Sequence, residues 1–265
     1  AENAGSLVGR IAALDGALIS AASQPQSEAR LVGLADAARN LTETFQRSSE
    51  EIQSARSTAD TRIAADVKAI NRALSAVAEL NGQIVAFNSD GRDPSALEDQ
   101  RQQLIDRIAP IVPLREMPRE NGRIALYTIT GAALLDGRPA ILGFSAAGVI
   151  TPDMTLASGA LSGLTLNGKP VKTDAAGALG GGSLSAQFAI RDTLAPDAQA
   201  NLDAVARDLI ERFADPALDS TLVTGDAGLF TDRGLALSVE NEVALQPRQS
   251  QLFRGWGAID GPYRH

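Results

Sequence analysis

Apolar side chains recur at steps of three and four residues along a stretch from Leu34 to Asn81 that contains no glycine or proline. Such a seven-residue repeat places a narrow apolar stripe along one side of a helix, and a second helix must cover that stripe. The steps slip after Ala59, which indicates a local break in the heptad phase. If the whole stretch is helical, it is about 70 Å long at 1.5 Å per residue, which is too long for the core of a compact enzyme of this size.

We call this stripe the seam. Its apolar members are Leu31, Leu34, Leu41, Phe45, Ile52, Ile63, Val67, Ile70, Leu74 and Val77, and the small residues Ala38, Ser48, Ala55 and Ala59 complete the repeat.

Shorter helical patterns lie on both sides of the long stretch. Residues 1–22 predict a short helix, and the long helix is predicted to end near Gly82, before a polar loop at 88–94. A second helix is predicted from Ser95 to about Ile108, because Pro110 stops it. Helical spacing then returns at Leu184, Phe188, Leu194, Leu202, Val205, Leu209 and Phe213. We expect these returning helices to cover the seam.

Between residues 111 and 182 the chain changes to short apolar runs separated by glycines. Asn121-Gly122, Asp136-Gly137 and Asn167-Gly168 lie between these runs, and such pairs favour the positive φ angles of hairpin turns. We therefore predict an antiparallel meander of hairpins, followed by a flexible hinge at Ala175 to Gly182.

The predicted fold class is α+β: a long-helix, coiled-coil-like shaft or bundle with an inserted antiparallel β-hairpin region. Residues 1–110 form the first part of the shaft, and 111–182 form the β-rich insertion. Residues 183–265 hold the returning helices and a C-terminal loop region that complete the shaft.

Composition removes most enzyme classes. The chain has no cysteine, and its one histidine is the last residue, His265. A disulfide framework, a thiolate metal site and a cysteine nucleophile are therefore excluded, and a histidine base or ligand has no candidate outside the terminus. The glycines at 177–182 lack the lysine of a P-loop, and 88–93 do not fit an EF-hand register. We predict no catalytic residue, no metal ligand and no cofactor.

The formal net charge is −8, and acidic residues outnumber basic ones in both halves of the chain. Phosphate-backbone binding needs a clustered cationic surface, so we expect neither nucleic acid nor a membrane as partner. The exposed face of the long helix carries Glu43, Arg47 and Glu51, whose charges alternate. Such a face is either solvated or in contact with a neighbouring subunit.

The order of short motifs resembles that of a known family. Residues 79–84, ELNGQI, and 97–105, LEDQRQQLI, are similar to the "LN..I … LLDQRD.LI" passage of the bacterial flagellar hook-associated protein 1 family, the hook-filament junction proteins. Residues 181–192 resemble its "GG.L..L…RD" passage, 201–213 its "LD.LA..L...F" pattern, and 228–232 its "GLF" loop. The matching positions are Leu80, Asn81, Asp99, Gln100, Arg101, Arg191 and Asp192.

The resemblance implies a structural, non-enzymatic component of the flagellar axis that joins hook to filament outside the cell. It implies export through the flagellar type III apparatus without a cleaved signal peptide. The implied partners are copies of the chain in a ring, hook protein, the second junction protein and an export chaperone for the full-length protein. Since the chain begins with Ala1 and shows neither terminal helix of the family, we expect a core fragment that is monomeric alone.

Two alternatives stay open. A flagellin or another hook-associated filament protein shares the long-helix shaft, although the passage at Asp99-Gln100-Arg101 argues against flagellin. A helical signalling or sensor domain also uses a long heptad helix, and it would carry a membrane span or a ligand pocket. An enzyme is the third possibility.

Overall fold

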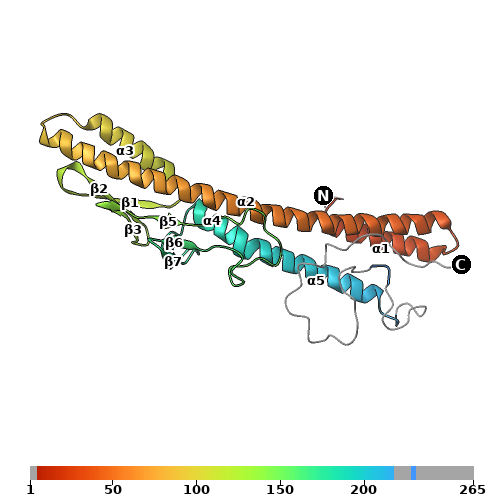
Figure 1. Cartoon of the computed structure of the whole chain (residues 1–265). Helices are drawn as coiled ribbons and strands as arrows, with labels where there is room; N and C mark the ends of the chain where they lie inside the picture. Colours follow the sequence, from red (N-terminus) through yellow and green to blue (C-terminus); the bar gives the residue numbers. More distant parts are fainter. Residues whose placement is uncertain (1–4, 218–227, 231–265) are drawn as a thin grey trace. The chain divides into compact units, whose positions relative to one another are not determined.

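The computed structural model describes residues 5–217 and 228–230 of the 265-residue chain, and its fold is α+β. Three helices come first: α1 (Leu7–Ser23), α2 (Glu28–Ser89) and α3 (Ser95–Ile108). Seven short strands follow, and α4 (Ser183–Ala189), a π-helical turn (Ile190–Leu194) and α5 (Ala195–Phe213) complete the described elements (Figure 1). Most of the predicted C-terminal loop region lies outside the described residues, as do Asp232 and Leu252 to His265.

Contacts divide the chain into two compact units. Unit 1 comprises Ala1–Gln53 and Pro196–His265, and unit 2 comprises Ser54–Ala195. The division therefore cuts α2 between Gln53 and Ser54. The three-part division inferred from sequence, at residues 110 and 182, stays a prediction about domains.

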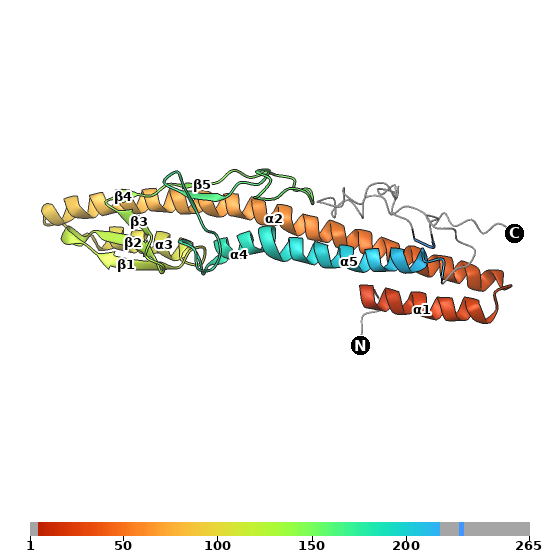
Figure 2. The ribbon, with the colours of Figure 1, turned by 90° about the horizontal axis from the view of Figure 1, so that it is seen from below.

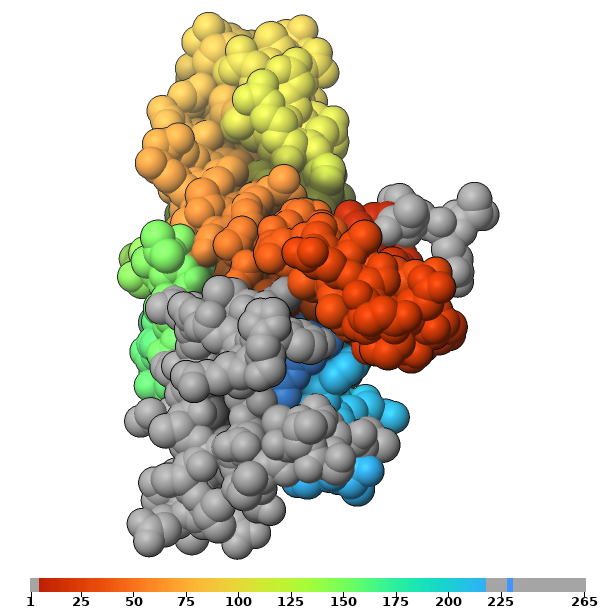
Figure 3. Space-filling model, turned by 90° about the vertical axis from the view of Figure 1, so that its right-hand side faces the viewer, coloured from red at the N-terminus to blue at the C-terminus, as the bar shows by residue number. Residues whose placement is uncertain are grey.

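Unit 1 is a helical assembly of α1, the first part of α2 and α5, which lie side by side in both ribbon views (Figures 1 and 2). Its core joins these helices to Phe230, whose ring meets that of Phe213 edge to face with centroids 5.1 Å apart. The Ser6 hydroxyl caps α1 by accepting from the amide of Gly9 at 3.2 Å, as serine does at helix starts. α1 and the start of α2, in red and orange, lie next to each other at the surface (Figure 3).

Unit 2 packs two small antiparallel sheets against the second part of α2. The first sheet has the order β1 (Leu114–Pro118), β2 (Ile124–Thr128), β3 (Ala133–Asp136), β4 (Arg138–Pro139), and the second has the order β5 (Leu142–Gly143), β6 (Leu164–Leu166), β7 (Lys169–Val171). The predicted single meander is therefore split in two.

The hairpin turns form where the sequence predicts them. Asn121 and Asn167 have φ of 56° and 51°, and the glycine after each is also in the left-handed region. Gly137, between β3 and β4, has φ of 80°. Asparagine and glycine reach this region with little strain, so these residues set the hairpin connections.

The helix α2 continues past its predicted end. It runs through Gly82 to Ser89, because a glycine in a helix interior costs only about 1 kcal/mol. Ile84, just beyond it, is fully buried, and that burial offsets the cost.

Of the ten apolar seam residues, Leu31 and Ile52 are half-buried and the other eight are buried. Two small positions differ from the predicted repeat. Ser48 is half-buried and Ala55 is exposed, whereas their neighbours Ser49 and Arg56 are buried. The shift in heptad phase thus begins before Ala59, and polar residues occupy the shifted positions.

The glycine-rich segment that precedes α4 is a packed turn and differs from the predicted hinge. A Cβ atom at Gly180 or Gly182 would lie 2.2 Å from the carbonyl oxygen of Ala175 or Ile111, respectively. Leu179, just before these glycines, is buried, and the Leu184 amide donates to the Ile111 carbonyl at 3.2 Å. Glycine is needed here because the backbones approach too closely for any side chain.

α4 and α5 are joined by the π-helical turn, which sequence spacing does not predict. The Ala195 amide donates to the Ile190 carbonyl, five residues earlier. Pro196 has no N–H to continue this pattern. Two residues on the expected apolar spacing, Leu194 and Val205, are 60% and 38% exposed, because the π-turn rotates the later residues relative to the earlier ones.

Candidate functional site

Buried polar side chains on α2 tie the rest of unit 2 to this helix. Asn81 donates to the Ile124 carbonyl at 2.8 Å and accepts from the Ile124 amide at 3.2 Å. One guanidinium nitrogen of Arg101, on α3, donates to Asn81 Oδ1 at 2.9 Å and to the Gly122 carbonyl at 2.7 Å. Burial lowers the pKa of Arg101, and Glu98 and Glu116 partly offset that effect. Asn81 and Arg101 therefore join α2, α3 and the first sheet at one point.

Asn71 makes the same two-bond arrangement with the second sheet. Its amide nitrogen donates to the Leu142 carbonyl at 2.8 Å, and its oxygen accepts from the Leu142 amide at 2.9 Å. A side-chain amide can pair in this way because it has the donor and acceptor of a peptide group.

A second polar cluster surrounds Arg191 in the π-turn. The guanidinium is fully buried and donates to Asp60 Oδ1 at 2.8 Å and to both oxygens of Asp192 at 2.7 and 2.9 Å. A further bond reaches the Ser162 carbonyl at 3.0 Å. Burial opposes the charge, but the hydrogen bonds that Arg191 donates to Asp192 and Asp60 raise its pKa above the ordinary value.

Two aromatic rings complete the surroundings of Arg191. Its Cζ lies 5.4 Å from the centroid of Phe144 and 5.0 Å from that of Phe188, and the two rings meet edge to face at 5.7 Å. The guanidinium is therefore held by cation–π contacts as well as by hydrogen bonds.

Arg56 and Asp60, one turn apart on α2, hold the long loop between β5 and β6. Arg56 donates to the carbonyls of Thr151 at 3.2 Å and Met154 at 2.6 Å, and Asp60 accepts from the Ala147 amide at 2.7 Å. Arg56 Nε also donates to the Arg191 carbonyl at 3.1 Å. That carbonyl is available because Pro196 has no N–H to bond it in the π-helical pattern.

Unit 1 has its own buried polar group between α2 and α5. Gln199 accepts from the Ser49 hydroxyl at 3.1 Å and from the Gln53 amide at 3.3 Å, and it donates to Asp203 at 2.8 Å. Burial raises the pKa of Asp203 to about 6, although the bond from Gln199 and the charge of Arg207 act in the opposite direction.

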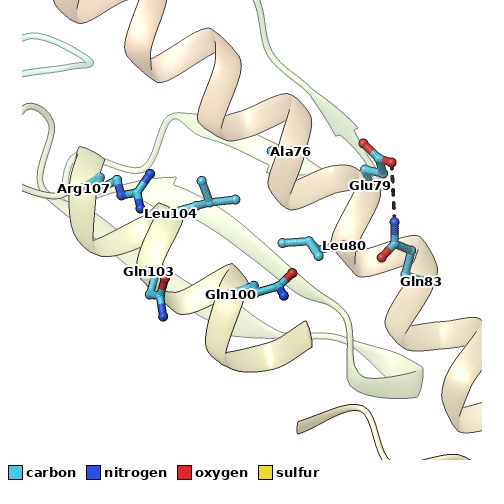
Figure 4. A pocket seen from close by; sticks show the side chains of 8 residues that line it. All are labelled: Ala76, Glu79, Leu80, Gln83, Gln100, Gln103, Leu104 and Arg107. Carbon is cyan, nitrogen blue, oxygen red and sulfur yellow. Dashed lines mark hydrogen bonds between the residues drawn. The ribbon is translucent and has the colours of Figure 1, made fainter. Parts of the chain in front are cut away.

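A groove of about 370 Å³ lies between α2 and α3. From α2 it is lined by Ala76, Glu79, Leu80 and Gln83, and from α3 by Gln100, Gln103, Leu104 and Arg107. Leu80 and Leu104 lie between the two helices, and the hydrogen bond from Gln83 to Glu79 runs along α2 (Figure 4). The groove has an apolar floor and amide-rich walls.

Within residues 5–217 and 228–230, acidic side chains do not gather into a group that could hold a metal ion. Asp60 and Asp192 both accept hydrogen bonds from the Arg191 guanidinium. None of the helices in the described ranges is apolar over the length that a membrane crossing needs.

Comparison with known proteins identifies the family. A model of the flagellar hook-associated protein FlgK helical domain matches residues 1–228. The chain belongs to the FlgK family. It is thereby a flagellar hook-associated structural protein and a component of the bacterial flagellum.

A solved structure, the flagellar hook junction protein FlgK from Burkholderia pseudomallei, has the same fold, with a TM-score of 0.66 and 19% sequence identity. The similarity covers 85% of this chain and 40% of that one, so this chain spans less than half the length of the FlgK structure that it matches. A search of curated proteins found no match.

The positions at which the sequence resembles the family motifs fall into two groups. Asn81 with Arg101, and Arg191 with Asp192, are in direct contact and bind other elements together. Leu80 and Gln100 line the groove, and Asp99 is exposed on α3.

Sequence reasoning missed Asn71, Arg56 and Asp60. The signal for the last two was present, since Arg56, Asp60, Ile63 and Val67 are spaced by four, three and four residues, which is the heptad spacing.

Proposed function

We propose that this chain is the helical part of a hook–filament junction protein, which joins hook to filament as a ring of copies. The match to the FlgK helical domain over residues 1–228 carries the proposal, and the similar solved structure is that of a flagellar hook junction protein. The proposed partners are copies of the chain, hook protein and the second junction protein, with an export chaperone for the full-length protein.

The geometry supports a mechanical role. Arg191, Arg101 and Asn81 are buried and bonded to other segments of unit 2, so they hold the unit together and do not act on a substrate. We propose no enzymatic activity, and we expect the chain alone to be monomeric in dilute solution. Export without a cleaved signal peptide and an extracellular position follow from the same proposal.

The test is deletion of the full-length gene in the source bacterium, followed by complementation. The expected result is hooks without filaments in the deletion strain, with flagellin released into the medium, and filaments restored by the gene. Gold-labelled antibody against this chain should mark one position, where hook meets filament.

Other outcomes would contradict the proposal. Label along the whole filament would indicate a flagellin-like protein, and label at the cell membrane would indicate a sensor domain. Filaments that still form in the deletion strain would exclude the junction role.

A further inference from the structure

Two surfaces of the chain are apolar, and no described part of the chain covers them. The first is one face of α1. Val8, Ala12, Asp15 and Ile19 follow one another at steps of four, three and four residues, which places them on one side of the helix. All four are exposed, and Val8 and Ile19 have 60% and 65% of their surface accessible.

This face is separate from the one that α1 buries. Leu14 and Ala21 belong to the core of unit 1 and are 2% and 6% exposed. A 17-residue surface helix needs one apolar stripe to pack on its own domain. A second stripe with large aliphatic side chains is typical of a helix that also packs against something else.

The second surface is the groove between α2 and α3. Its floor is formed by Ala76, Leu80 and Leu104, and Gln103 and Arg107 are exposed along its α3 wall. Small and aliphatic residues between two neighbouring helices form a groove into which the side chains of a third helix can pack.

One charge on each surface can pair with the other. Asp15 is the only charged residue in the α1 stripe, and the groove is lined by one basic residue, Arg107 on its α3 wall, and one acidic residue, Glu79 on its α2 wall. Within the part of the chain that the structure describes, neither the Asp15 nor the Arg107 side chain has an ion pair or a hydrogen bond. Burying an unpaired carboxylate is unfavourable, so a surface that covers the α1 stripe should place a cation next to Asp15.

We infer that the exposed face of α1 of one copy packs into the α2–α3 groove of a neighbouring copy, with Asp15 opposite the neighbour's Arg107. The inference rests on the proposed assembly of copies. The contact joins two different surfaces, and a contact of this kind generates a ring or a helical array rather than a closed pair.

The absence of cysteine from the chain makes disulfide cross-linking a direct test. Ala12→Cys and Gln103→Cys are introduced together into the full-length protein in the source bacterium, and isolated flagella are oxidised. The expected result is a ladder of cross-linked copies. The matched control is Ala13→Cys with Gln103→Cys, because Ala13 is also exposed but lies about 100° further around α1, and this control should give no ladder.

Charge reversal tests the pair itself. Asp15→Arg and Arg107→Asp should each reduce the number of filaments at least about tenfold, since each places like charges together, and the double reversal should restore them. Asp99→Arg, the same charge change at an exposed α3 position outside the groove, should have no effect. Equal amounts of exported protein show that the variants fold.

The outcomes separate this inference from the proposed function. Label at the junction without the Ala12–Gln103 cross-link would overturn the contact and leave the junction role intact. Cross-linking of Gln103→Cys alone, to itself or to another protein, would show that the groove receives a different occupant and would also overturn it. A chain that is absent from the junction would refute the proposed function itself.

Discussion

Replacement of Arg191 by methionine gives the sharpest test of how unit 2 is held together. Methionine keeps much of the apolar volume between Phe144 and Phe188 but removes every hydrogen bond of the guanidinium. Asp60, which is fully buried, loses its cation, and the Ser162 carbonyl loses its donor at 3.0 Å.

The magnitude follows from these losses. Removing one partner of a buried ion pair costs about 3–5 kcal/mol, because the other charge stays buried and uncompensated. The unsatisfied carbonyl adds to this, while Asp60 keeps its bond from the Ala147 amide at 2.7 Å. We expect Arg191→Met to lower the free energy of unfolding by about 4 kcal/mol, which is a shift of about 2 M in the urea midpoint at a slope of ~2 kcal/mol per M.

The assay is urea unfolding followed by far-ultraviolet circular dichroism. The control is Arg39→Met, because Arg39 pairs with Asp36 on the surface of α2, where the two side chains are 57% and 56% exposed. This variant should change the free energy of unfolding by less than about 0.5 kcal/mol.

A second variant separates charge from packing. Asp60→Asn combined with Arg191→Met removes the uncompensated charge, so the double variant should be more stable than Arg191→Met alone. If Arg191→Met costs less than about 1 kcal/mol, or if the double variant is no better, the buried ion pair does not hold this unit together and the reasoning is refuted.

Three further predictions use the same unfolding assay. Asn81→Ala should cost about 1–3 kcal/mol, because the amide and carbonyl of Ile124 lose their partner and Arg101 keeps only its bond to the Gly122 carbonyl; a cost near zero would contradict its role. Gly182→Ala should destabilise by at least about 1–3 kcal/mol, since its Cβ would lie 2.2 Å from a carbonyl oxygen, whereas Gly82→Ala, with nothing within 4 Å, should stabilise by about 0.5–1 kcal/mol. The folded state keeps a proton on Asp203 up to about pH 6, so the stability of the chain relative to Asp203→Asn should fall as pH rises from about 4 to about 6 and then level off; a difference independent of pH would refute the raised pKa.

The sequence predicted the helices and turns well where one local rule decides them. The α3 boundaries, Ser95 and Ile108, agree with the structure, because a proline follows shortly after and the apolar spacing is regular. The paired asparagine and glycine residues predicted the hairpin turns, since few other residues tolerate positive φ.

The features that sequence did not predict depend on long-range contacts. Arg56 and Asp60 are polar, and the loop between β5 and β6 together with Arg191 makes their burial favourable. The glycines at 180 and 182 have the composition of a linker, but the closeness of Ile111 and Ala175 explains them. The bond between Asn71 and the second sheet is also long-range, because its partner Leu142 is far away in the sequence.

Asn71 and Asn81 also set a length scale. They lie ten positions apart on one helix, about 15 Å at 1.5 Å per residue, and each pairs with both backbone groups of one residue, Leu142 or Ile124. The spacing of the two asparagines on α2 therefore sets the distance between the points at which the two sheets are attached to this helix. An insertion or deletion in α2 between these asparagines would shift one asparagine along the helix and rotate it away from its sheet. The ten-residue spacing can therefore change only if the attachment of the sheets changes with it.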